Sequence, residues 1–269
     1  DGRPMECLQL EKELTEHFGL TNCIIAPDLG GGDDDSALRA VAVSAAQFLS
    51  GMLGGSNVTR LGVGMGRTLT AAVEALPKVA RTDLEIMSIC GSLTRTLAAN
   101  PYDIVQKMQE RTGGIGYYLP VPYFAENQDE KAMFLTQRSV QDLMDRARQS
   151  DAFLIGIGSV ENEGHLVQRG MISKKEQEDL LSGGAVCDLM GRFLTIEGKL
   201  APDPLGDCAV GLHFDEVRGR RVIALVGGES KVDATLAALR TGVITDLVAD
   251  ETLARALTAR AGLQLAQSA

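Results

Sequence analysis

The stretch that decides the fold is "VTRLGVGMGRTLTAAVEAL", residues 58–76. Its first apolar residues predict a short buried strand, and three glycines within residues 62–66 then predict a tight loop. From Thr68 to Leu76 the apolar residues recur at helical spacing, and Pro77 follows. A strand, a tight loop and a helix in this order are typical of an α/β protein.

The same alternation extends on both sides of this stretch. A helix is expected from Asp35 to about Leu53, because apolar residues recur there at helical spacing and "GGSN" breaks the pattern. Further strands are expected at residues 84–90, 115–121, 152–158, 221–228 and 244–249, and further helices at 102–110, 139–148, 231–240 and 251–261. Such alternation predicts a Rossmann-like, mostly parallel sheet with helices on both faces. Residues 185–194 and 207–214 carry extended patterns without a helix between them, which suggests a small antiparallel insertion.

Composition excludes several classes of protein. With 269 residues, 45% of them hydrophobic, the chain can bury a full core, and no apolar run approaches the roughly 20 residues that span a bilayer. No membrane contact is therefore expected. The formal charge of -10 argues against nucleic-acid binding by this chain, because phosphate backbones are held by clustered lysine and arginine. The partner is expected to be a small molecule.

Cysteine and histidine give no sign of a metal site. The five cysteines are odd in number, widely spaced and without a C-x-x-C pair, so neither a disulfide framework nor a zinc site is indicated. The three histidines, His17, His165 and His213, are scattered and lack ligand spacing. A reducing cytoplasm fits this pattern, and neither a metal nor a cofactor is expected.

The glycine loop matches neither common nucleotide motif. A dinucleotide fingerprint, G-x-G-x-x-G, needs glycine where Arg67 stands, and the Walker sequence is absent. Glycines still let backbone N–H groups approach an anion, and the helix that opens at Arg67 and Thr68 points its positive end to the same place. The alternative is a turn in which the glycines permit close packing and Thr68 caps the helix.

A second loop has the same arrangement of glycines between an apolar strand and the start of a helix. In "VIALVGGESKVDATLAAL", residues 222–239, an apolar strand delivers Gly227, Gly228 and Lys231 to the start of a helix. Loops that follow parallel strands lie on one edge of the sheet, where ligands of open α/β folds bind. A cation at the positive end of a helix is disfavoured unless an anion lies nearby. One anion site shared by the two loops explains both.

At this point the residues carry a family resemblance. "LGVGMGRTL", "YYLPVPYF", "AFLIGIGSV", "LLSGGAVCDLMGRFL" and "RVIALVGGESKVDATLAALRTGVITDLVADETLA", in this order, resemble the effector-binding domain of SorC-type bacterial transcriptional regulators. The resemblance runs from about Leu20 to Leu263. It implies a fold similar to glucosamine-phosphate deaminase and ribose-phosphate isomerase. It also implies that a phosphorylated sugar or related metabolite binds and alters oligomerisation and operator affinity.

The resemblance also implies two groups of effector contacts. It puts the effector phosphate on Gly66, Arg67, Thr68 and Lys231, and the sugar hydroxyls near Asp188, Gly91, Ser92 and Arg169. The phosphate group agrees with the two-loop argument made from the residues alone. One departure concerns Cys208, because family members often carry an arginine in this segment, and the role of that arginine cannot be transferred.

The family's helix-turn-helix domain should precede this sequence. Here only residues 8–20 suggest an amphipathic helix before the α/β pattern begins. Residues 1–20 are therefore expected to be the remnant of a linker to a missing DNA-binding domain, and residues 21–269 the effector-binding domain. Operator DNA would bind through the missing domain, and the family implies a homo-oligomer, a dimer or tetramer.

Two other functions remain open beside the sensor. A sugar-phosphate isomerase or deaminase could share the fold, but such chemistry needs a positioned general base. The sequence shows no strong acid and histidine constellation, although Asp188 or Glu229 could be argued for. No catalytic residue is predicted, and a non-enzyme is expected. A sensor of an unphosphorylated sugar or polyol is the third possibility.

Overall fold

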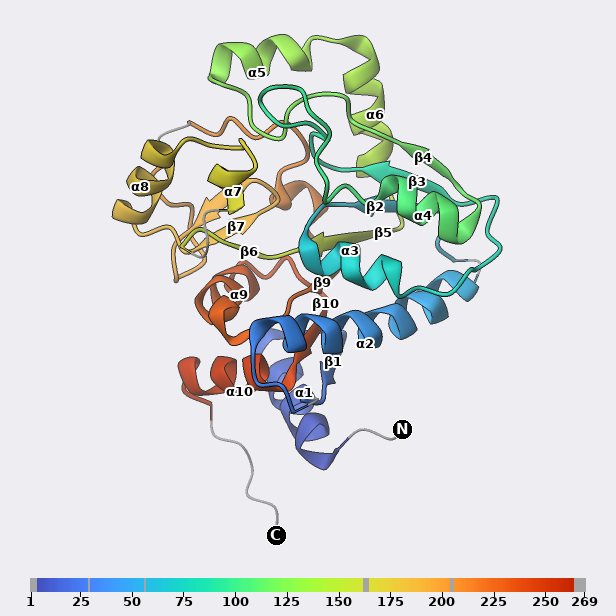
Figure 1. Cartoon of the computed structure of the whole chain (residues 1–269), viewed down its shortest axis with the longest axis vertical. Helices are drawn as coiled ribbons and strands as arrows, with labels where there is room; N and C mark the ends of the chain where they lie inside the picture. Colours follow the sequence, from blue (N-terminus) through green and yellow to red (C-terminus); the bar gives the residue numbers. More distant parts are fainter. Residues whose placement is uncertain (1–3, 29, 56, 162–164, 204–205, 264–269) are drawn as a thin grey trace.

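A parallel sheet of seven strands forms the centre of the computed structural model (Figure 1), which describes residues 4–28, 30–55, 57–161, 165–203 and 206–263. The strand order is β1-β10-β9-β5-β2-β3-β4, and neighbouring strands pair in parallel. The strands are β1 (Asn22–Ala26), β2 (Arg60–Val63), β3 (Glu85–Ser88), β4 (Ile115–Tyr117), β5 (Ala152–Gly156), β9 (Arg221–Leu225) and β10 (Asp246–Asp250). The mostly parallel α/β fold predicted from the sequence is confirmed.

Helices cover both faces of this sheet. On one face α2 (Asp34–Gly54), α3 (Arg67–Glu74) and α4 (Val105–Thr112) share a hydrophobic cluster with the sheet. On the other face lie α1 (Met5–Phe18), α6 (Arg138–Arg148), α9 (Val232–Arg240) and α10 (Glu251–Arg260). In the central strand β5, Phe153 and Ile155 belong to one cluster while Ala152 and Leu154 belong to the other. The alternation of side chains along each strand thus fills two layers of core.

Three short segments form a second, antiparallel sheet beside the main one. These are β6 (Gly158–Ser159), β7 (Cys187–Leu189) and β8 (Arg192–Leu194), in the order β6-β7-β8. The antiparallel insertion expected at residues 185–194 is therefore present. The other segment expected there, residues 207–214, makes only isolated bridges, from Ala209 to Phe124 and from Gly211 to Cys90.

The remaining helices are α5 (Gln128–Leu135), α7 (His165–Gln168), α8 (Lys174–Ser182) and two short 3-10 helices at Phe214–Val217 and Glu229–Lys231. Helices α7 and α8 lie beside the antiparallel sheet, whereas α5 packs against α6 (Figure 1). A Ser173 capping box begins α8, because the Ser173 hydroxyl accepts from the backbone N–H of Glu176 and the Glu176 carboxylate accepts from the N–H of Ser173.

The first helix packs as part of the domain. Cys7, Leu10 and Leu14 of α1 are fully buried in the same hydrophobic cluster as residues of α10. The Glu11 carboxylate also accepts the backbone N–H of Ile25 in β1 at 2.8 Å. Residues 5–18 therefore form one body with the residues that follow, and the family's preceding DNA-binding domain stays a prediction.

Helix α2 is the one described helix that is long and apolar enough to cross a membrane by length and composition. Its 21 residues instead place Val41, Ala45, Leu49 and Leu53 in the core, where they are fully buried. Packing against the sheet accounts for its apolar composition.

Candidate functional site

A cavity of about 200 Å³ opens at the carboxyl ends of the parallel strands. Its walls come from the loops after β2, β5 and β9, from the start of α2, and from the hairpin of β7 and β8. After β2 the chain continues outward to β3 and β4, whereas β5 lies on the other side of β2. Such a switch point in strand order is where open α/β sheets bind ligands.

The loop after β2 forms one end of the cavity. The backbone N–H of Gly64 donates to the carbonyl of Leu154 at 2.8 Å, which holds the loop against β5. Gly66 is the N-cap of α3, and no side chain among the described residues caps that helix. The first turn of α3, with Arg67 and Thr68, therefore presents its positive end to the cavity. The Arg67 guanidinium lies 3.8 Å from the Asp35 carboxylate.

The loop after β9 lies beside it. Gly228 has a φ of +105°, and its backbone N–H donates to the buried Asp250 carboxylate at 2.8 Å. A Cβ at Gly228 would lie 2.7 Å from the side chain of Asp34, so glycine is needed both for the backbone and for the space. The next residues bring Lys231 into the cavity wall, where its ammonium donates to the carbonyl of Ile157 at 3.3 Å.

The charge of Lys231 is held in a poorly hydrated place. Burial lowers the pKa of its ammonium below the ordinary lysine value, and the neighbouring Arg67 lowers it further. Cys187, Asp188 and Asp34 act in the opposite direction. Because Arg67 and Lys231 repel each other, an anion bound between them would stabilise both charges. The two glycine loops expected to share an anion site do line one cavity.

Asp188 lies in another part of the cavity wall, in β7. Its carboxylate accepts the backbone N–H of Gly191 at 2.8 Å and a hydrogen bond from the Tyr123 hydroxyl. Burial raises the pKa of this carboxyl to about 6, although Gly191, Lys231, Arg192 and Tyr123 all favour the charged form. Near neutral pH the carboxylate can accept hydrogen bonds from a ligand's hydroxyl groups.

An arginine and a tyrosine meet across a further part of the wall. The Arg169 guanidinium stacks over the Tyr102 ring at 4.4 Å from the centroid and donates to the Tyr102 hydroxyl. Asn100 also lines the cavity, and its amide donates to the Met65 sulfur at 2.6 Å. Leu166 and Met171 supply apolar surface. This part of the cavity offers one cation and several uncharged polar groups.

The structure brings six of the eight predicted residues together around the cavity, namely Gly66, Arg67, Thr68, Arg169, Asp188 and Lys231. Gly91 and Ser92 are not among its described lining residues, although their neighbour Cys90 is. A Cβ at Gly91 would lie 2.1 Å from the carbonyl oxygen of Pro122, so this glycine permits a close approach of two chain segments. Ser92 is buried, with its hydroxyl 3.4 Å from that of Ser88.

Other lining residues were missed from the sequence. Tyr102 and Asn100 lie in the long loop after β3, and Asp34 and Ser230 link the start of α2 to the loop after β9 by a hydrogen bond. Tyr123 stands in the segment "YYLPVPYF", just after the strand expected at residues 115–121, and no pattern there marks its side chain as facing a ligand. The only available signal was position, because loops after parallel strands lie at the ligand-binding edge.

The described residues hold no group of three or more histidine, cysteine, aspartate or glutamate side chains that could bind a metal. The described cavity wall contains no histidine. The five cysteines are buried and form no disulfide within the described part of the chain, and burial raises the pKa of the Cys90 and Cys187 thiols. These thiols are therefore poor nucleophiles.

Comparison with known proteins finds a family model that matches nearly the whole chain. Residues 2–259 match the family model of a sugar-binding domain (Sugar-bind). The chain is 35% identical to the erythritol catabolism regulatory protein EryD of Brucella abortus, over 96% of this chain and 81% of that protein. It is 30% identical to the transcriptional regulator LsrR of an Enterobacter species, over 95% of this chain and 77% of that protein. The names of these relatives point to a role other than catalysis.

Solved structures agree on the fold. A domain of a sugar-binding transcriptional regulator from Arthrobacter aurescens superposes with a TM-score of 0.85 at 26% identity, over 96% of this chain and all of that domain. The full-length sorbitol operon regulator SorC of Klebsiella pneumoniae superposes with a TM-score of 0.81 at 21% identity, over 96% of this chain and 82% of that protein.

Proposed function

The chain belongs to the sugar-binding domain family of SorC-type transcriptional regulators, and we propose that it senses a phosphorylated sugar or polyol. One observation carries the proposal: the uncapped start of α3 and the half-buried Lys231 ammonium face the same cavity as the Asp188 carboxylate. A ligand with an anionic group and several hydroxyls matches these two kinds of partner.

The phosphate would lie between the two glycine loops. Backbone N–H groups at the start of α3 would donate to its oxygens, together with the Thr68 hydroxyl, the Arg67 guanidinium and the Lys231 ammonium. Gly66 and Gly228 lack side chains, so the backbone can approach the anion closely. Each charged hydrogen bond of this kind contributes about 1.5–3 kcal/mol.

The hydroxyl groups would meet Asp188, with Arg169 and Asn100 nearby in the wall. A ligand without hydroxyl groups should bind more weakly, because it would offer the buried carboxylate no hydrogen-bond donor. The name of the relative EryD, which refers to erythritol, supports a polyol or small sugar as the ligand class.

In the cell the domain would act through assembly. Effector binding would change the balance between two oligomeric states, and with it the affinity for operator DNA of a separate DNA-binding domain. Only a ligand with different affinities for the two states can do this. The relatives are transcriptional regulators, which implies a cytoplasmic location.

Thermal unfolding against a ligand panel tests the proposal. The panel pairs erythritol 4-phosphate, ribose 5-phosphate and glucose 6-phosphate with erythritol, ribose and glucose, and includes inorganic phosphate. A ligand at about 100 times its dissociation constant stabilises by roughly 2.7 kcal/mol, a shift of about 5–10 °C for this size. A shift confined to the phosphorylated compounds is expected. A shift with the free sugars or polyols alone would contradict the role of Arg67 and Lys231 in binding a phosphate.

The enzyme alternative is tested on the sugar phosphates of the panel and on glucosamine 6-phosphate. A sensor returns its ligand unchanged, whereas an isomerase or deaminase converts it. Incubation of the protein with each bound sugar phosphate, including glucosamine 6-phosphate, followed by ³¹P NMR is expected to show no new resonance. Catalytic accumulation of a second phosphorylated species would overturn the sensor proposal.

A further inference from the structure

The turn between β7 and β8 places two side chains in the cavity wall. Leu189 pairs with Arg192 across the hairpin, so Met190 and Gly191 are the two residues of the loop. Both have positive φ, +53° and +82°, as in a type I′ turn. A methionine rarely adopts this conformation, and non-glycine residues held in it often belong to functional sites. Asp188 and Met190, on either side of Leu189, both line the cavity.

One buried arginine holds this turn in place. Arg192 has a side chain only 6% exposed, and its guanidinium donates to the carbonyl of Met190 at 3.1 Å and to that of Leu212 at 2.8 Å. Its Nε donates to the Asp207 carboxylate at 3.0 Å, which neutralises the buried charge. The planar fork therefore joins the turn to two points of the segment 207–214, and lysine could not reproduce it.

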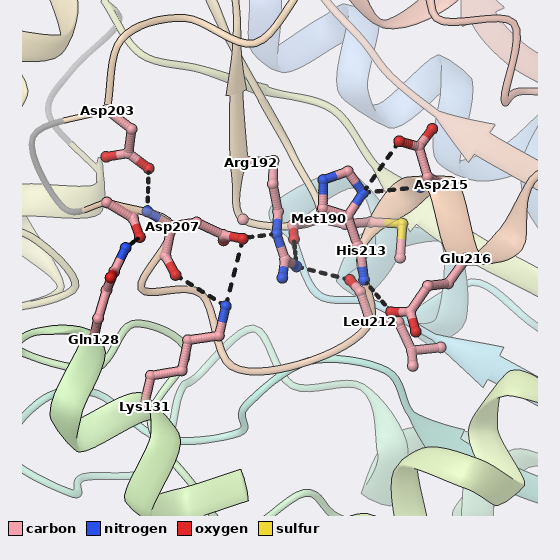
Figure 2. Close-up of polar contacts among 12 residues, drawn as sticks. Gln128, Lys131, Met190, Arg192, Asp203, Asp207, Leu212, His213, Asp215 and Glu216 are labelled. Atoms are coloured by element: carbon pink, nitrogen blue, oxygen red, sulfur yellow. Dashed lines mark hydrogen bonds and ion pairs between the residues drawn. The ribbon is translucent and has the colours of Figure 1, made fainter.

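Asp207 extends the connection to the surface. Figure 2 shows Asp207 between Arg192 and Lys131 of α5. The Lys131 ammonium donates to the Asp207 carbonyl at 2.9 Å and lies 3.4 Å from its carboxylate, while Gln128 donates to the carbonyl of Gly206. No described residue of α5 is fully buried, so these polar contacts contribute to docking the helix. Asp207 itself has a φ of +58°.

We propose that Arg192 is a positioning residue for effector recognition: it fixes the turn that presents Asp188 and Met190 to the cavity, and through Asp207 and Lys131 it ties that turn to α5. The inference rests on the proposed function, since it assigns Arg192 to the hydroxyl end of the same cavity. It predicts that Arg192 governs affinity for the polyol part of the ligand and not for the phosphate part.

Affinity measured with two probes separates positioning from stability. Arg192→Lys keeps the charge and loses the fork, so calorimetric titration should show a dissociation constant for erythritol 4-phosphate raised by about tenfold or more. The dissociation constant for inorganic phosphate, which contacts only the two glycine loops, should change by less than about twofold. Equal affinity of wild type and Arg192→Lys for erythritol 4-phosphate, or equal losses for both probes, would overturn the assignment.

Arg81→Lys is the matched control. Arg81 is also a buried arginine whose guanidinium donates to backbone carbonyls, those of Leu53, Gly55 and Val58, and it pairs with Asp83. It lies before β3, at the edge of the sheet opposite the cavity. Arg81→Lys should lower the midpoint of thermal unfolding while both dissociation constants stay at their wild-type values. A loss of affinity in this control as large as in Arg192→Lys would show a general effect of lost stability and overturn the positioning role.

A measurement without ligand keeps the two proposals distinguishable. In protein labelled with ¹³C at the methionine methyl groups, the Met190 resonance, assigned through Met190→Leu, should move in Arg192→Lys. It should also move in Asp207→Gly, which suits the positive φ but lacks the carboxylate. The resonance of Met108, buried in the other hydrophobic cluster, should stay in place. If the Met190 resonance stays in place in both variants, the inference is overturned, whether or not a probe binds. If the resonance moves but the wild type binds neither probe, only the proposed function is overturned.

Discussion

Lys231→Met is the most informative single change, because affinity and stability should respond to it in opposite directions. The lysine ammonium has its pKa lowered by burial, so its charge is less favourable in the folded than in the unfolded protein. A folded-state pKa below the unfolded value means that the charged lysine destabilises the fold below that pKa. Methionine has similar length and no charge. The ligand-free variant should therefore unfold at the wild-type temperature or above.

With ligand the order should reverse. Loss of one charged hydrogen bond to phosphate costs about 1.5–3 kcal/mol, roughly a 10- to 150-fold rise in dissociation constant. Take erythritol 4-phosphate at about 100 times the wild-type constant, which stabilises the wild type by roughly 2.7 kcal/mol. After a rise of about 30-fold the same concentration stabilises by only about 0.9 kcal/mol, and the thermal shift falls from about 5–10 °C to about 2–3 °C.

Differential scanning fluorimetry with and without the ligand measures both quantities in one experiment. Lys175→Met is the control, because the side chain of Lys175 is 82% exposed on α8 and lies outside the cavity. This control should retain the full ligand shift. If Lys231→Met lowered the unfolding temperature of the ligand-free protein and left the ligand shift intact, Lys231 would be a structural residue and the phosphate assignment would be refuted.

Three further predictions follow from buried groups. Burial raises the pKa of Asp188 to about 6, so the folded protein binds more protons than the unfolded chain between about pH 4 and 6. The free energy of unfolding should fall by about 3 kcal/mol as the pH rises through this window. Urea unfolding at several pH values should show this fall in the wild type and not in Asp188→Asn. Gly91→Ala would force a Cβ to 2.1 Å from the Pro122 carbonyl oxygen, costing about 3 kcal/mol or more in urea unfolding; wild-type stability would contradict the close approach. Glu176→Ala leaves the Arg95 guanidinium, with a side chain 12% exposed, without its 2.7 Å partner and should cost about 3 kcal/mol, whereas an unchanged urea midpoint would show that the pair is not stabilising.

The sequence predicted most strands and helices because their patterns are strong. Strands such as β5 and β9 are short apolar runs next to glycine, and α2 carries a long helical period. The strand β1 was missed, since its five residues, "NCIIA", stand before a glycine-rich loop without a repeating pattern. Helix α5 was missed for another reason: none of its described residues is fully buried, so it carries no apolar stripe for a sequence pattern to detect.

The phosphate half of the candidate site was predictable because its two loops have a local signature. Glycines between a strand and a helix start can be recognised in the sequence, and parallel strands bring such loops to one edge. The opposite wall has no such signature. The contact of Arg169 with Tyr102 joins residues 67 positions apart, and it depends on how the loop after β3 folds back over the sheet.

Gly91 shows why a glycine near a predicted site is ambiguous. Glycine permits close approach of a backbone, but the sequence does not say whether the approaching group belongs to a ligand or to another part of the chain. At Gly228 the nearest side chain, that of Asp34, also lines the cavity, so the glycine shapes the site. At Gly91 the neighbour is the Pro122 carbonyl, which joins the loop after β3 to the segment that carries Tyr123. Gly91 would then influence the ligand indirectly, through its neighbour Cys90 and through Tyr123, which donates to the Asp188 carboxylate. Its substitution should therefore act on stability first and on affinity second.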